Sequence, residues 1–545
     1  MDRCRAKVRK KGEIMSTAQF IEADISNELL DRMHYNADPL ADHTIAAILG
    51  EWSLPSSASP VLSVSAAVNT AIPPAAAAVE YGAQWLPEWQ KLLMVNRIFE
   101  DWTDNKSLLA WSGQGSGAIT EAEPTIPPEM AEPLRAYVQA AQSLPLWADI
   151  NKIARAEELF MDYGALSVTL LFCSSLPECY VIPDLAEVLH TTGQLEKHTE
   201  HRIRATGAMI FPVMMRGGLT HPDGGGIAQI FKVRLIHATV RNLILRGTPE
   251  SAVATLGSGQ NSVGMGVIPP LPALKAAPDM HQVLFAHGWE LGEDGLPCNQ
   301  EELGYTLLTF GYVFLRSMRK LGHALSTTDE EAFLHAWNVM GYFLGIERAL
   351  MPDTMAQAET LFTLMQARGR QHHDADKRRE CDQHAAVKTR IQMVDYDPRP
   401  ALGAALMGAM KQVIPISVIK PFPVMLTRYL CGPATSKDLG LTGVISMLSR
   451  LLFTGFMLTV RVIDTLGRLV YPGFSIALFI TRILGYRFMK QMLMDQTRPL
   501  KLPQSVKERV NTMMLHWGER IQEPVWVHSL ENYLSGKNSN EAIKK

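Results

Sequence analysis

The stretch FKVRLIHATVRNLIL, residues 231–245, is apolar over most of its length but carries one histidine between two arginines. Its apolar residues recur at helical spacing, which predicts a buried helix. On a helix that turns by about 100° per residue, Arg234 lies about 60° and Arg241 about 40° around the helix from His237. The three side chains therefore share one face, where buried charges need partners.

Helical patterns also dominate on both sides of this stretch. Residues 147–172 repeat apolar side chains at helical spacing, and residues 200–218 and 227–247 end in glycines, which favour helix C-caps. Alternating strand patterns are hard to find. Three further helix starts carry the capping-box pattern, namely Asn299 to Glu302, Thr328 to Glu331 and Ser505 to Glu508. The sequence predicts an all-α chain.

Composition excludes several classes of function. The 52 Lys and Arg residues against 55 Asp and Glu residues leave a net charge of -3, so no global field attracts nucleic acid or an anionic membrane. The six cysteines form no C-x-x-C pair, which removes zinc ribbons, thioredoxin-like redox motifs and a covalently attached c-type haem.

Two features bear on location. The basic residues 1–15 are followed by a polar stretch and not by an apolar signal-peptide core, which predicts a cytoplasmic protein. Residues 451–460 and 469–481 are hydrophobic but too short to cross a bilayer. They predict buried helices and are also compatible with a peripheral membrane contact. The charged run 369–384 predicts a solvated helix face or a junction.

Other catalytic patterns are missing or incomplete in the sequence. Residues 257–266 contain several glycines but lack the Lys-Ser/Thr of a phosphate-binding loop. A di-iron helix bundle needs two Glu-x-x-His pairs, and the chain supplies one clear pair, Glu187 with His190. These observations leave the face around His237 as the strongest candidate for chemistry.

A haem would satisfy that face. The imidazole of His237 can bind the iron, and the guanidinium groups of Arg234 and Arg241 can pair with the propionate carboxylates. Arg202 and Thr206, four residues apart, share one face of the preceding predicted helix. The alternative is a core histidine bonded to a backbone carbonyl, with arginines that extend to the surface.

The chain resembles the latex-clearing-protein type rubber oxygenases and the wider MpaB-type oxygenases. The resemblance covers roughly residues 38–350 and is carried by an ordered set of stretches: DPLAD (38–42), LFCSSLPECY (171–180), AEVLHTTGQL (186–195), RIRAT (202–206), VRLIHATVR (233–241) and GLPCNQEELGYTLLTF (295–310). PFPVMLTRYLCG (421–432) resembles the C-terminal part of the family.

The resemblance implies a globin-like helical core with additional N- and C-terminal helices, and one b-type haem with His237 as iron ligand. It implies that Arg202 and Thr206 lie beside the haem, and that Glu187, with Glu178 as competitor, lies near the distal pocket. Rubber-cleaving members can carry a lysine where this chain has Ala205. This departure favours another substrate over polyisoprene.

The expected organisation is an N-terminal arm and linker (1–80), a haem-binding oxygenase domain (81–400) and a C-terminal helical region (401–545). The expected function is a haem b-dependent oxygenase that uses O2 to cleave or oxidise C=C bonds of an apolar unsaturated lipid or isoprenoid-like substrate. The alternative is a haem-binding redox or gas sensor on the same fold that turns over no substrate.

Overall fold

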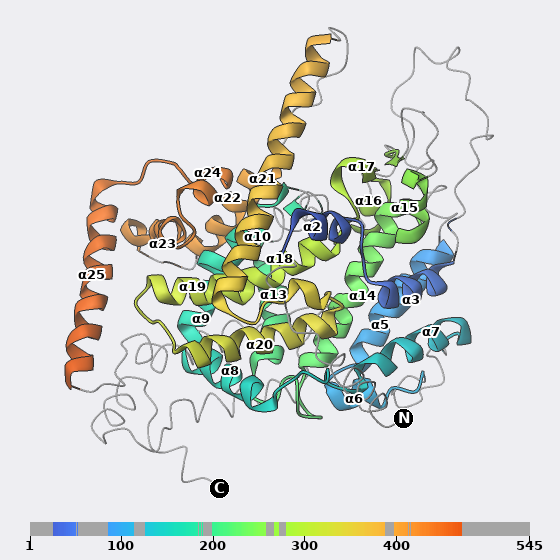
Figure 1. Cartoon of the computed structure of the whole chain (residues 1–545), viewed down its shortest axis with the longest axis horizontal. Coiled ribbons are helices and arrows are strands. Elements are labelled where there is room, and N and C mark those ends of the chain that lie inside the picture. Colours follow the sequence, from blue (N-terminus) through green and yellow to red (C-terminus); the bar gives the residue numbers. More distant parts are fainter. Residues whose placement is uncertain are drawn as a thin grey trace, which may run out of the picture.

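The computed structural model describes residues 25–50, 52, 86–113, 126–183, 185–186, 188, 199–257, 266–271, 280–386, 397–412, 414 and 416–470. Most of this part of the chain is helical (Figure 1). The first half contains α2 (Asn27–His34), α3 (Pro39–Leu49), α5 (Leu86–Asp101), α6 (Asn105–Leu109), α7 (Pro128–Gln139), α8 (Ile150–Asp162), α9 (Gly164–Leu170), α10 (Leu176–Cys179), α13 (Thr199–Met214), α14 (Gly226–Leu245) and α15 (Pro249–Gly257). A short π-helix, Leu171–Ser175, joins α9 to α10.

The second half continues the helical pattern. It contains α16 (Met280–Ala286), α17 (Leu291–Asp294), α18 (Gln300–Phe310), α19 (Tyr312–Lys320), α20 (Thr327–Leu344), α21 (Met355–Ala386), α22 (Pro398–Gln412), α23 (Phe422–Cys431), α24 (Pro433–Asp438) and α25 (Met447–Val470), with 3-10 turns at Ala140–Gln142, Arg348–Leu350 and Ser417–Ile419. Within the described residues the only strands are β1 (Val267–Ile268) and β2 (Trp289–Glu290), which pair antiparallel. The all-α prediction is confirmed.

Helix α14 is the central helix of the fold. It is buried on nearly all sides, as expected of a helix that neighbours surround. It packs against α3, α13, α16 and α20 (Figure 1). The N-terminal helix α3 thus contacts the core directly, although it falls inside the predicted arm 1–80. The predicted division into 1–80, 81–400 and 401–545 stays a prediction.

The end of α14 differs from its prediction. The left-handed residue that terminates the helix is Arg246, with φ 53°, and not Gly247. The Arg246 side chain donates from Nε to the carbonyl of Phe285 at 2.9 Å and lies over the Phe285 ring. These contacts stabilise a backbone conformation that a non-glycine residue rarely adopts.

Side-chain caps mark the starts of α18 and α20. Asn299 accepts from the backbone N–H of Glu302 at 2.9 Å, which confirms Asn299 as the cap of α18. The cap of α20 is Ser326, which accepts from the N–H of Asp329, so the predicted cap at Thr328 is wrong by two residues. The pattern at Ser505 lies outside the described residues.

Two predictions on the second half have different outcomes. The charged run 369–384 lies within α21, so it continues a helix. Residues 451–460 form part of α25 and are helical as predicted, but the prediction that they are buried is wrong, because Leu451 is 62% exposed and Leu458 61% exposed. Most of residues 469–481 fall outside the part that the structure describes.

Among the described residues, no single helix is both long and apolar enough to cross a bilayer. The consecutive segments Ile150–Asp162 and Leu166–Cys179, bent by 88°, meet the requirement only when taken together.

Candidate functional site

His237 lies on the one half-buried strip of α14. Val233, Ile236, His237 and Val240 are half-buried, whereas Arg234, Leu235, Ala238 and Thr239 on the other sides of the helix are buried. The spacing of three, four and seven residues places these four side chains on one face. The strip therefore combines one imidazole with three aliphatic side chains, and these three aliphatic side chains contact the core.

Arg234 is buried and is paired with Asp38. The guanidinium donates from Nε to Oδ2 of Asp38 at 2.5 Å and from Nη2 to Oδ1 at 2.7 Å, and Nη1 donates to the carbonyl of Phe343 at 3.1 Å. Burial by itself would lower the pKa of Arg234, but the hydrogen bonds and charge of Asp38 outweigh it and the pKa is raised. The pair has the bidentate geometry that arginine and carboxylate favour.

Gly345 allows this pair to form. It ends α20 with a φ of 86°, and a Cβ atom there would lie 2.6 Å from Oδ2 of Asp38 and 2.8 Å from Nε of Arg234. Both the backbone conformation and the close approach therefore require glycine. The C-terminus of α20 is packed directly onto the ion pair.

Arg241 makes a second ion pair between the same two helices, one turn further along α3 and two turns further along α14. Its Nε donates to Oδ1 of Asp42 at 2.8 Å, and Nη1 donates to the carbonyl of Cys298 at 2.6 Å. Both members of the pair are buried. Burial raises the pKa of Asp42, and Arg241 opposes that shift. The Nη2 atom of Arg241 is buried and has no hydrogen-bond partner among the described residues.

The sequence stretch DPLAD supplies both carboxylates. Asp38 is the N-cap of α3 and Asp42 lies one turn later, where its Oδ2 atom accepts from the N–H of Asp38 at 3.0 Å. We call the pairs Asp38–Arg234 and Asp42–Arg241 the α3–α14 ion-pair ladder. The chain thus supplies counter-charges for both arginines. Their predicted contact with haem carboxylates stays a prediction.

Helix α13 carries the residues predicted to lie beside the haem. Arg202 and Thr206 are one turn apart on α13, and α13 packs along α14. Thr206 is half-buried. The side chain of Arg202 lies outside the part of the chain that the structure describes. The backbone arrangement therefore brings the R-x-x-x-T stretch next to the helix of His237, and the role of its side chains is not tested.

Of the two candidate glutamates, Glu187 lies outside the described residues, and Glu178 is buried. The Glu178 carboxylate accepts from Nη2 of Arg316 at 2.6 Å, from Gln366 at 2.7 Å and from Thr435 at 3.0 Å. These donors come from α19, α21 and α24, so Glu178 joins three helices. The place of Glu178 or Glu187 near a distal pocket stays a prediction.

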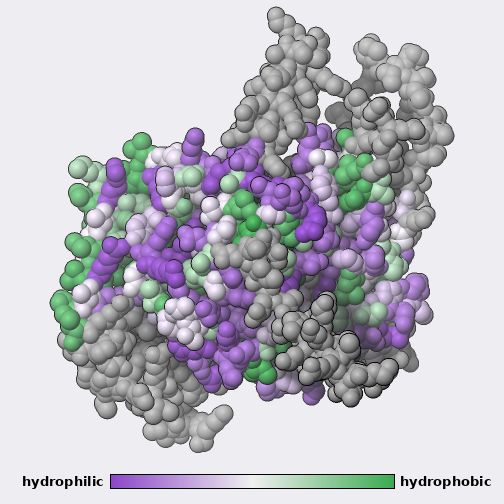
Figure 2. Space-filling model, in the orientation of Figure 1, coloured by the Kyte–Doolittle hydropathy of each residue, from purple (hydrophilic) through white to green (hydrophobic). Residues whose placement is uncertain are grey.

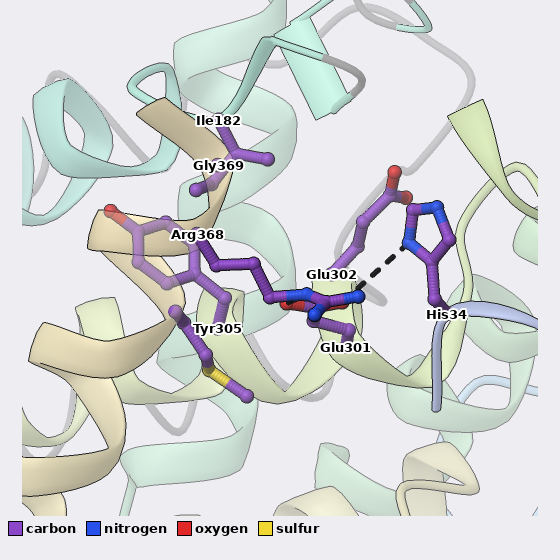
Figure 3. A pocket seen from close by; sticks show the side chains of 8 residues that line it. His34, Ile182, Glu301, Glu302, Tyr305, Arg368 and Gly369 are labelled. Atoms are coloured by element: carbon purple, nitrogen blue, oxygen red, sulfur yellow. Dashed lines mark hydrogen bonds and ion pairs between the residues drawn. The ribbon is translucent and has the colours of Figure 1, made fainter. Parts of the chain in front are cut away.

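A small cavity lies near α2, α18 and α21 (Figure 3). It has a volume of about 20 Å3 and is lined by His34, Glu301, Tyr305 and Arg368, among others. Nδ1 of His34 lies 3.5 Å from Glu301, and Nε of Arg368 lies 3.1 Å from the same carboxylate. The cavity has room for about one water molecule, far less than the roughly 300 Å3 of a small-molecule pocket.

A metal ion held by protein ligands alone needs several ligating side chains close together. The described residues contain no group of three or more His, Cys, Asp or Glu side chains that could hold one. This requirement does not apply to haem iron, which can take a single protein ligand.

Comparisons with known proteins agree with the motifs. Residues 279–462, from just before α16 into α25, match the family model described as "ER-bound oxygenase mpaB/B'/Rubber oxygenase, catalytic domain". The rubber oxygenase of Streptomyces sp. (strain K30) is 22% identical over 263 residues, which are 48% of this chain and 50% of the relative. The chain thus matches about half the length of this curated relative.

A solved structure of latex clearing protein LCP in the closed state is also similar. Its TM-score is 0.48 at 18% sequence identity, and the match covers 78% of this chain and 83% of that chain. Residues 279–462 are thus similar to the catalytic domain of the rubber oxygenase and MpaB-type family.

Proposed function

We propose that the protein is a haem b-dependent oxygenase that acts on C=C bonds of an apolar unsaturated lipid or isoprenoid-like substrate. The observation that carries the proposal is the strip of α14 where His237 lies among Val233, Ile236 and Val240. An imidazole on an aliphatic surface fits the needs of a haem, because one nitrogen can bind the iron and the aliphatic groups can pack on the macrocycle.

Each residue has a proposed role. His237 holds the iron through its imidazole, and the aliphatic side chains beside it exclude water. When bound, the haem supplies the binding and activation of dioxygen. Arg202 donates hydrogen bonds to the haem periphery, and Thr206 offers a hydroxyl beside it. Glu187 is the proposed carboxylate that takes an allylic proton from the substrate.

The role proposed for Arg234 and Arg241 of α14 differs from the pairing with haem carboxylates that the sequence predicts. Arg234 and Arg241 are neutralised by Asp38 and Asp42, and this arrangement supports a role in holding α14 in place. Contact of either guanidinium with a haem carboxylate is a separate proposal. The buried Nη2 atom of Arg241 is the donor available for it.

The first test is haem binding. We expect purified protein, reconstituted with haem, to show a Soret band, with the pigment extractable into acidified organic solvent because no covalent link holds it. His237→Ala should lose the ligated spectrum. His43→Ala is the matched control, since His43 is an exposed histidine that pairs with Glu250 on the surface. Equal loss of haem in the two variants would contradict the assignment of His237.

The second test is turnover. The loaded protein is incubated under ¹⁸O2 with a panel of unsaturated lipids and oligoisoprenoids, and carbonyl products are analysed by mass spectrometry. Labelled carbonyl ends support the oxygenase. A protein that binds haem and forms no oxidised product with any member of the panel would support the sensor instead. The cytoplasmic location stays a prediction that cell fractionation can check.

A further inference from the structure

Exposed hydrophobic side chains are concentrated at one place on the molecule. Of the 19 large hydrophobic side chains that are exposed in the described residues, 11 lie between Val444 and Leu469. Ten of them belong to α25: Met447, Leu448, Leu451, Leu452, Phe456, Leu458, Val462, Ile463, Leu466 and Leu469. Figure 2 shows hydrophobic residues gathered along the edge where Figure 1 places α25. Scattered exposed residues are ordinary, but a continuous apolar face marks an interaction site.

The helix separates its side chains by type. At about 100° per residue, the ten exposed hydrophobic residues fall within an arc of about 180°, and Arg450 and Arg461 lie within about 20° of each other just beyond one edge of it. Both arginines are exposed. The helix is about 36 Å long at a rise of about 1.5 Å per residue. We call the ten hydrophobic residues with these two arginines the α25 face.

The opposite side of α25 is attached to the protein. Ser449 donates to the carbonyl of Val418 at 2.8 Å, and the Phe453 ring lies 5.4 Å from the ring of Phe422. Asp464 is buried and lies 3.4 Å from His323. These contacts fix the rotation of α25 so that its apolar arc points away from the protein.

Charge at this surface is positive. Asp464 is the only acidic residue from 444 to 470, and it is on the attached side. A groove of about 580 Å3 at the N-terminal end of α25 is lined by Lys411 and Arg428 and by no acidic residue. Arg428 donates to the carbonyls of Leu441 and Gly443, and burial together with the neighbouring Arg450 lowers its pKa. Lys411, Arg428 and Arg450 therefore make this surface attract anions and repel cations, although the whole chain has a net charge of -3.

We propose that the α25 face binds the surface of a membrane that contains anionic lipids. An apolar arc bordered by arginines is the arrangement of a helix that lies in the interface, with its apolar side among acyl chains and its cations at the headgroups. Charge complementarity selects this partner over a second copy of the chain, because a symmetric contact between two α25 faces would bring like charges together.

The experiment is vesicle co-sedimentation of the full chain. The probes are vesicles of phosphatidylcholine alone and vesicles that also contain phosphatidylserine. We expect binding to the anionic vesicles, weaker binding to the neutral ones, and a decrease at about 1 M salt, where charges are screened within about 3 Å. Arg450→Gln should weaken binding to anionic vesicles roughly fivefold.

Substitutions at apolar residues distinguish vesicle binding through the α25 face from non-specific hydrophobic binding. Leu451→Asp/Leu458→Asp should weaken vesicle binding roughly tenfold or more, because two side chains no longer enter the acyl region. Leu146→Asp is the matched control, since Leu146 is 91% exposed and lies on the segment before α8. We expect it to bind as the unchanged protein does. Thermal melting of each variant shows that it is folded.

Three results would overturn the proposal. The first is no binding of the folded full chain to either kind of vesicle. The second is an equal loss of binding in Leu146→Asp. The third is a dimer, seen by light scattering, that Leu451→Asp/Leu458→Asp converts to a monomer without any effect on vesicle binding, since the face would then serve self-association. Vesicle binding requires neither haem nor turnover, so its failure is distinct from failure of the proposed oxygenase.

Discussion

Removal of one charge from the α3–α14 ion-pair ladder should destabilise the whole fold. In the Asp42–Arg241 pair, the Arg241 side chain is 0% exposed and the Asp42 side chain 2% exposed. Asp42→Asn preserves the shape of the side chain but leaves the Arg241 guanidinium buried without a counter-charge. A broken buried pair of this kind costs about 3 to 5 kcal/mol. That is a large share of the roughly 5 to 15 kcal/mol by which a domain is stable.

Urea unfolding followed by tryptophan fluorescence measures this cost. The matched control is Glu132→Gln, which breaks the surface pair of Glu132 and Arg135 and should cost about 0 to 1 kcal/mol. The double variant Asp42→Asn/Arg241→Gln should be more stable than the sum of the two single variants predicts, with a coupling of about 1 kcal/mol or more. A cost of Asp42→Asn below about 1 kcal/mol, or additive single effects, would refute the reasoning.

The same variants separate the two roles proposed for Arg241. If Arg241 acts through Asp42 to hold α14, then Asp42→Asn and Arg241→Gln should both lower stability and leave haem retention per folded molecule unchanged. If Arg241 instead binds a haem carboxylate, Arg241→Gln should release haem while Asp42→Asn retains it. Haem dissociation and unfolding are measured on the same samples, so that lost stability is not mistaken for lost affinity.

Two buried ionisable groups predict opposite effects of pH on stability. Burial lowers the pKa of Lys232 to about 8, so the unfolded chain binds the extra proton between about pH 8 and 10.5 and stability rises with pH in that window. Lys232→Met should abolish this rise in urea unfolding and add up to about 3 kcal/mol at pH 7, whereas an unaltered pH dependence would exclude Lys232 as its source. Burial raises the pKa of Glu157 to about 7 despite hydrogen bonds from the backbone at Gly217 and its neighbours, so stability falls as pH rises from about 4.5 to 7. Glu157→Gln should remove that fall, and a curve that stays parallel to the unchanged protein would contradict the assignment.

The helical class could be predicted because it depends on local patterns. The apolar repeat of residues 231–245 is visible in the sequence and becomes the central helix α14. The Asn299 cap was also predicted, since its partner is three residues away. The predicted start of α20 differs because Ser326 and Thr328 both offer a hydroxyl, and residue type alone does not choose between two positions this close.

The partners of the arginines could not be predicted by the same means. Asp38 lies 196 residues before Arg234, and Asp42 lies 199 residues before Arg241. Local spacing cannot reveal such a pairing. A signal did exist, because two carboxylates one turn apart match two buried arginines that share a face of another helix. The exposure of α25 could not be predicted for a related reason. An apolar stretch predicts a helix face that is covered, but the local sequence does not identify whether the rest of the chain or a separate partner covers it.

The geometry of the ladder links the buried charges to the proposed iron ligand. Asp38 and Asp42 are about 6 Å apart along α3, whereas Arg234 and Arg241 are about 10 Å apart along α14, so the long arginine side chains must converge on the carboxylates. Rotation of α14 by one residue, about 100°, would break both pairs at once. His237 lies between the arginines in sequence and emerges on the adjacent half-buried strip. We infer that the ladder fixes the rotation of α14 and thereby the direction in which the His237 imidazole points.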